Sequence, residues 1–203
     1  MKWLLLSLLS TFLIGCGPDL DDPKELDTII EEAMDVSKIQ ERGEGDQALF
    51  YAPNKQQPYT GWVKKISDSG QVRELVQIKD GKKNGLHANW SNNGQKVYEE
   101  EYKDGELHGL TTAWHENGQK GLAAEYKDDA AHGDLTAWYE NGQKRSEQEW
   151  KNGKLVKAKT WLPDGSDCPD TNVKNGSGIR VFYGDDGKES SRDEFKNGIK
   201  ISE

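Results

Sequence analysis

The sequence predicts an all-β repeat protein: a meandering antiparallel sheet of stacked β-hairpins with a short N-terminal helix. A segment recurs with a spacing of 24 residues, at 85–96 (GLHANWSNNGQK), 109–120 (GLTTAWHENGQK) and 133–144 (GDLTAWYENGQK). A fixed period of this size is typical of stacked arrays. The several glycines of each copy exclude a helical repeat. The 33% hydrophobic and 31% charged content suits a shallow structure with many side chains in water.

Residues 1–15 have the pattern of a bacterial lipoprotein signal peptide. Lys2 supplies a positive charge, an apolar run follows, and Gly15 precedes Cys16. The run is too short for a permanent transmembrane helix. Because the pattern resembles a lipobox, we expect cleavage before Cys16 and lipid attachment to its thiol, which would anchor the chain in a membrane. Gly17 then favours the outer membrane of the cell envelope, by the same resemblance. The alternative is an ordinary signal peptide with an incidental cysteine.

Residues 16–47 are predicted as an acidic tether and an amphipathic helix. Asp22 can cap the helix, Pro23 occupies its first position, and Glu25 completes a capping box. An apolar stripe at helical spacing predicts a helix that ends within residues 36–40. We expect this stripe to cover the first edge of the sheet. The stripe consists of Leu26, Ile29, Ile30, Ala33 and Met34.

Residues 48–203 are the predicted repeat domain, of about six repeats. Asn-Gly pairs alternate with Lys-Asp-Gly or Lys-Asn-Gly triplets, and both are strong signals for tight turns with positive φ. The segments between them have strand length, which predicts roughly twelve antiparallel strands. The opening glycines of the regular repeats are Gly61, Gly85, Gly109, Gly133 and Gly178.

Two departures from the repeat predict irregularity in the C-terminal third. Asp129 stands where the other copies have a turn glycine. A degenerate repeat precedes the last one, lacks its opening glycine and has lost a residue near Lys157. The second cysteine, Cys168, follows in a solvated-turn composition, so we expect an unpaired loop thiol whose thiolate Asp167 and Asp170 disfavour. The alternative is a disulfide to another chain.

A column of large aromatic residues recurs five positions after the openers, and a second column recurs seventeen positions after them. We expect the recurring aromatics to stack as a ladder along one face. Exposed, this ladder would bind a partner or stack on sugars; buried, it would be the core, which the polar composition favours. The candidate residues of the first column are Trp90, Trp114, Trp138, Trp161 and Tyr183, and the second column includes Tyr102, Tyr126, Trp150 and Phe195.

The polar columns do not predict a catalytic or metal site. The glutamates at 101, 125, 149 and 194 and the lysines two positions later indicate a solvated charge ladder. His108 and His132 share one repeat position, but equivalent residues lie two strands apart, about 9–10 Å. That distance is too large for both to bind one zinc ion directly. We therefore expect no metal, no cofactor and no enzymatic activity.

The net charge is −9. Nucleic acid and anionic lipid head groups are therefore not expected as partners. A soluble, non-adhesive surface is the simpler interpretation of the charge, and a basic partner is the alternative.

The segment YKDGELHGLTTAWHENG at 102–118 resembles the MORN repeat, and more closely its variant in YwqK-like antitoxin proteins. Their opening motif is matched by PYTG at 58–61, and the resemblance covers residues 48–198. It implies a MORN-like sheet and the binding and neutralising of a partner protein, and it supplies no catalytic residue. The sequence thus predicts a lipid-anchored envelope protein that acts as an interaction or scaffold module for a protein partner, in the manner of an antitoxin or immunity protein. The alternative is a module that binds envelope glycan or lipid through the aromatic ladder.

Overall fold

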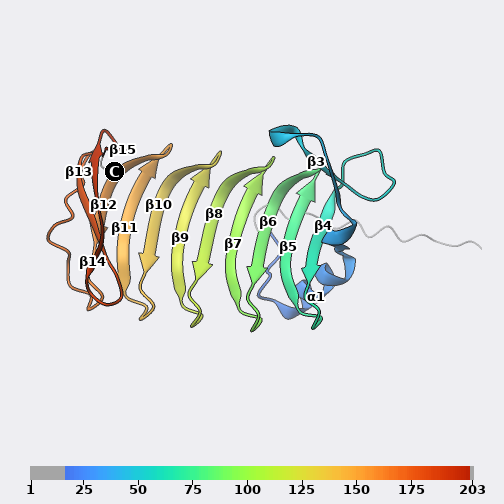
Figure 1. The fold of residues 1–203 in the computed structure, drawn as a ribbon, viewed down its shortest axis with the longest axis horizontal. Coiled ribbons are helices and arrows are strands. Elements are labelled where there is room, and N and C mark those ends of the chain that lie inside the picture. The colour runs from blue at the N-terminus through green and yellow to red at the C-terminus, as the bar shows by residue number, and fades with distance from the viewer. Residues whose placement is uncertain (1–16, 202–203) are drawn as a thin grey trace, which may run out of the picture.

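The computed structural model describes residues 17–201 (Figure 1). The predicted signal segment and the predicted lipidation residue, Cys16, lie outside the described residues. Within 17–201, no helix has both the length and the apolar character that crossing a membrane requires.

The centre of the described chain is a ten-stranded sheet, nine strands of which form one antiparallel meander in chain order (Figure 1). The predicted all-β fold of stacked hairpins behind a short helix is therefore confirmed. The meander comprises β4 (Gly61–Ile66), β5 (Val72–Lys79), β6 (Lys82–Trp90), β7 (Lys96–Lys103), β8 (Glu106–Trp114), β9 (Lys120–Lys127), β10 (Ala130–Trp138), β11 (Lys144–Lys151) and β12 (Lys154–Thr160).

The N-terminal helix α1 (Pro23–Glu32) begins as predicted, with the Asp22 carboxylate accepting a hydrogen bond from the backbone N–H of Lys24 at 2.8 Å. The predicted capping box is wrong, because the Glu25 carboxylate accepts from the N–H of Asp19 instead. The predicted end within 36–40 is also wrong. The backbone becomes extended at Ala33, and β1 (Met34–Asp35) then pairs in parallel with β4.

The first strands are covered on three sides. β1 covers the edge of β4, which we expected the helix to cover. α1 packs instead on one face of β4–β6. A hairpin of β2 (Gln40–Arg42) and β3 (Leu49–Tyr51) lies by the opposite face; the short 3₁₀ helix Val36–Lys38 precedes it, and a second one, Gly45–Gln47, connects its two strands. There Ile39, Phe50 and Tyr59 pack on buried residues of β4 and β5.

The two ends of the meander use different turns. The Lys-Asx-Gly turns have positive φ at both central residues, as at Asp80 (49°) and Gly81 (80°), which is the predicted two-residue geometry. The Asn-Gly turns have positive φ at the glycine alone, as at Gly94 (82°), so the two-residue prediction is wrong for them. Here the side chain of Asn93 accepts from the N–H of Gln95 at 3.2 Å and holds a longer loop.

The meander ends at the degenerate repeat, so the expectation of one sheet of roughly twelve strands is wrong. In the regular Lys-Asx-Gly hairpins the strand that contains the opening glycine has two extra residues. Between the pairs Val76↔His87 and Ile78↔Lys83, for example, β5 advances by two residues and β6 by four. In β11–β12 the corresponding step accommodates one extra residue, between Glu149↔Lys157 and Trp150↔Leu155. The lost residue thus changes the register. After Thr160 the chain leaves the sheet and forms a separate one of β13 (Gly178–Tyr183), β14 (Glu189–Lys196) and β15 (Ile199–Lys200).

Candidate protein-binding face

We call the face of the meander on which α1 packs the α1 face. On β6 it carries Leu86, Ala88 and Trp90, because Ala88 and Trp90 are buried in one cluster with α1 and side chains alternate along a strand. The pairing register extends this face across the sheet. Its equivalent residues are Leu110, Thr112 and Trp114 on β8, and Asp134, Thr136 and Trp138 on β10.

The two aromatic columns lie on opposite faces, so the prediction of one ladder along one face is wrong. Tyr102 pairs with Gly85 and its ring lies 5.9 Å from that of His87, which alternates with Ala88. Gly85 and Trp90 are five positions apart on β6, so alternation along the strand places Trp90 and the Tyr102 opposite Gly85 on different faces. Tyr183 belongs to the separate sheet, so it also leaves the ladder.

The tryptophans of the first aromatic column also differ from one another in burial. Trp90 is 7% exposed and belongs to the core under α1, whereas the rings at 114, 138 and 161 are only partly buried. The alternatives of core and exposed ladder therefore both apply, at different repeats.

The first unit of the α1 face is already occupied by the chain itself. Leu20, Ile29 and Ala33 are buried against Ala88 and Trp90. Beside them, the Lys96 ammonium donates to Asp21 at 2.7 Å and to Glu99 at 2.8 Å. Burial lowers the pKa of Lys96, but these two carboxylates outweigh burial and raise it above its ordinary value. An apolar contact bordered by an ion pair therefore holds the helix.

The second unit repeats the leucine, tryptophan and lysine of the first, with the buried Thr112 in place of Ala88, and lies outside the cluster that contains α1. Leu110 is 47% exposed, and Trp114 is partly buried. Lys120, the equivalent of Lys96, makes no ion pair with any residue of 17–201. The exposed carboxylates of Glu101 and Glu125 likewise make none with the described chain. This surface combines apolar area with unpaired charges of both signs.

The third unit adds a like-charge pair. Asp134 and Glu149 are directly opposite each other on β10 and β11, an arrangement that destabilises a sheet. Lys157 offsets part of this repulsion through an ion pair with Glu149 at 2.9 Å. Of the predicted charge ladder, Glu149 is thus paired with Lys157, a lysine outside the ladder, whereas Glu101, Glu125 and the lysines at 103, 127 and 151 make no ion pair within residues 17–201.

The sequence interpretation missed a buried cluster around His87 on the face opposite to α1. His87 is 4% exposed, and its two ring nitrogens lie 3.0 Å from Glu74 and 3.3 Å from Glu100. The hydrogen bond with His87 lowers the pKa of the Glu74 carboxyl. Burial, and then the charge of Glu100, raise the pKa of Tyr102, whose hydroxyl donates to Glu100 at 3.0 Å.

The Lys83 ammonium also lies 3.3 Å from Nδ1 of His87, so both ring nitrogens are occupied by protein side chains and the cluster offers neither to a ligand. His87 lies directly opposite Glu100 on β7, and Glu74 lies two residues from Val76, the direct partner of His87 on β5. The sequence signal is the single histidine at this repeat position, because the equivalent residues are Thr111 and Leu135. In the described part of the chain, no group of three or more His, Cys, Asp or Glu side chains is arranged to hold a metal ion.

The two histidines that share a repeat position connect neighbouring turns. His108 Nδ1 lies 3.1 Å from the Asp128 carboxylate, and His132 Nδ1 lies 2.9 Å from the Asn152 side-chain oxygen. Each histidine thus contacts the next turn along the array rather than the other histidine.

Cys168 differs from its prediction, because it is buried rather than solvated. Its backbone N–H donates to the carbonyl of Thr160, and its sulfur lies 3.7 Å from the hydroxyl of Thr171. Burial raises the pKa of the thiol, but hydrogen bonds from Thr160, Thr171 and the backbone outweigh it and lower the pKa. The lowered pKa contradicts the expectation that Asp167 and Asp170 disfavour the thiolate.

No protein-family model matches the chain, and neither does any curated protein. The chemistry of the α1 face therefore indicates what it can do. Half-buried indoles, an exposed leucine and unpaired charges suit apolar contact with a complementary charged partner. Stacking on sugars needs open ring faces, but Lys96 lies 5.4 Å from the ring centre of Trp114 and Lys159 lies 4.8 Å from that of Trp161.

Proposed function

We propose that this chain is a lipid-anchored envelope protein whose repeat domain binds a partner protein through the α1 face of β7–β10. The observation that carries the proposal is internal. The chain binds its own amphipathic helix on the first unit of this face, and the next unit offers a similar surface uncovered, two strands away. Apolar surfaces that are bordered by charged side chains are typical of protein interfaces.

The charges of the second unit define the partner. Lys96 takes a carboxylate from the α1 segment, so Lys120 calls for an acidic side chain in the same place. Glu101 and Glu125 call for lysine or arginine. Leu110 and Trp114 call for an apolar stripe between the charges. An amphipathic helix with a mixed-charge border satisfies all three requirements.

The resemblance to YwqK-like antitoxin proteins supports a neutralising role for this binding, and the lipobox pattern supports attachment to the outer membrane. A scaffold that holds its partner at the membrane uses the same surface. The alternative of glycan or lipid binding through the ladder has less support, because lysine ammonium groups already lie by two of the rings.

The test is capture of partners from detergent-solubilised envelopes of the source cell with four variants of the full chain. Leu110→Asp and Glu125→Lys alter the face. Their matched controls are Ile199→Asp, at an apolar residue that is 56% exposed in the separate sheet, and Glu116→Lys, at an exposed turn. One protein in stoichiometric amount that both controls retain and both face variants lose is the expected result. Equal capture by all four chains would refute the proposed face.

A further inference from the structure

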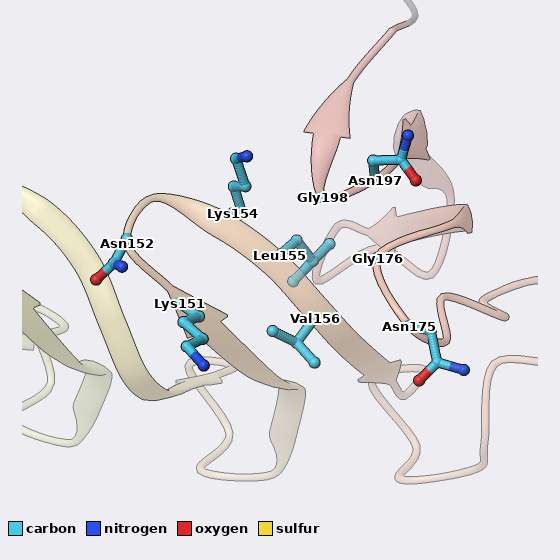
Figure 2. Close-up of a pocket in the computed structure, with 9 residues that line it drawn as sticks. All are labelled: Lys151, Asn152, Lys154, Leu155, Val156, Asn175, Gly176, Asn197 and Gly198. Atoms are coloured by element: carbon cyan, nitrogen blue, oxygen red, sulfur yellow. The ribbon is translucent and has the colours of Figure 1, made fainter.

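A cavity of about 480 Å³ lies where the regular array ends. Figure 2 shows residues from three turns around β12, with Leu155 and Val156 between Lys151 and Lys154 on one side and the later turns on the other. The remaining lining residues are Asn152, Asn175, Gly176, Asn197 and Gly198.

The lost residue of the degenerate repeat accounts for this cavity. In the regular turns the second turn residue donates its N–H to a carbonyl 22 positions earlier, as from Gly153 to Ala131. Gly176 instead donates to Val156, which lies 20 positions earlier, whereas Gly198 keeps the regular interval and donates to Gly176 at 2.7 Å. The later turns are thus displaced relative to β12, and their asparagines stand across the gap from the β11–β12 turn.

Most polar side chains that line the cavity make no ion pair or hydrogen bond with the described chain. Lys151 and Lys154 make no ion pair with the described chain, and the side-chain amides of Asn175 and Asn197 have no hydrogen-bond partner in it. Asn152 is the exception, since its side-chain oxygen faces His132. Paired lysines also occur at the regular turns, as at Lys79 and Lys82, but only at this turn of the described chain do two ammonium groups face the amides of displaced later turns across a cavity.

These groups fit one class of ligand. Ammonium groups bind a carboxylate or phosphate oxygen, and amides both donate to and accept from hydroxyl groups. Val156, which is partly buried, adds an apolar side chain to the lining, whereas the Leu155 side chain is 1% exposed and packs with Val173 and Phe195. We propose that the cavity binds a sugar that carries one anionic group. This site is separate from the α1 face and does not depend on the proposed partner binding.

The test is isothermal titration of the full chain in mild detergent with glucuronate, glucose 6-phosphate and glucose. Binding of glucuronate alone identifies a carboxylate ligand, and binding of glucose 6-phosphate alone identifies a phosphate; either supports the proposal. The double variant Lys151→Gln/Lys154→Gln should weaken that binding by about tenfold or more, because hydrogen bonds to charged groups are the strong ones.

The matched control is Lys79→Gln/Lys82→Gln, which removes two lysines from the same positions of the regular β5–β6 turn and should bind as the unaltered chain does. A second readout needs no variant: the side-chain amide resonances of Asn175 and Asn197 should shift on titration of the unaltered chain. No binding of either anionic sugar at millimolar concentration, equal binding of glucose, or equal weakening in the control overturns the proposal.

Discussion

Replacing Trp90 and Trp114 separately by alanine tests whether α1 makes equivalent positions unequal. Both residues are tryptophans at the same repeat position on the same face. Trp90 is 7% exposed under α1, whereas Trp114 lies beyond the helix and is partly open. Any difference between the two variants therefore reports the cover rather than the residue type.

The expected magnitudes follow from burial. Truncating a buried tryptophan to alanine costs about 3–5 kcal/mol, which is the loss expected for Trp90→Ala. Trp114→Ala removes less buried area and should cost about 1–3 kcal/mol at about 25 cal/mol per Å². Trp90→Ala should also release α1, since Leu20, Ile29 and Ala33 share its cluster.

The assay is urea unfolding followed by far-UV circular dichroism, with amide hydrogen exchange of α1 as the second readout. Repeat proteins can unfold in steps, so the two readouts are compared directly. Trp90→Ala should be the less stable variant and the one that accelerates exchange in α1. If Trp114→Ala costs as much, or if exchange in α1 stays slow in Trp90→Ala, the assignment of the covered and open units is wrong.

Three further predictions concern single residues. Asp129 has φ of 62°, and its carboxylate accepts a hydrogen bond from the N–H of Leu107 at 2.7 Å. Asp129→Ala should therefore lower the free energy of unfolding in urea by about 1–2 kcal/mol. Asp129→Gly relieves the backbone strain of the positive φ, so its free energy of unfolding should stay within about 1 kcal/mol of that of the unaltered chain. Burial raises the pKa of Asp193, but hydrogen bonds from Lys200 and Arg180 outweigh burial and lower it. The stabilising contribution of Asp193 is therefore complete above the unfolded-chain pKa of about 3.9 and is lost as pH falls through the lower folded pKa. In thermal unfolding from pH 7 to pH 2, Asp193→Asn should lose less stability on acidification than the unaltered chain. Parallel curves of stability against pH would contradict this. Asp22→Ala should cost about 1 kcal/mol and accelerate exchange at the start of α1, and unchanged exchange there would show that the cap is dispensable.

The hairpins could be predicted because their signals are local. The Asx-Gly pairs and the period of 24 determine where the chain turns, and neither depends on distant contacts. The helix start at Asp22 was predictable for the same reason. Its end was not, because β1 stops the helix by pairing with β4, a strand that begins at Gly61.

The faces and the end of the sheet could not be predicted. The register of β6–β7, with its irregularity at Trp90, decides which residue of β6 lies opposite Tyr102, so an aromatic period alone could not place Trp90 and Tyr102 on opposite faces. One lost residue near Lys157 ends the meander, although most of the repeat pattern continues beyond it. Partial cover by α1 also made one aromatic column both core and surface.

The most direct test of the central claim is photocrosslinking in the source cell. A photoreactive phenylalanine analogue replaces Leu110 on the α1 face or, as the control, Ile199 in the separate sheet, and adducts are identified by mass spectrometry. The account predicts one protein crosslinked from position 110, absent from position 199, and lost when Glu125→Lys is added. No adduct from position 110, or the same adduct from both positions, would contradict the claim that the open unit of the α1 face binds a partner protein.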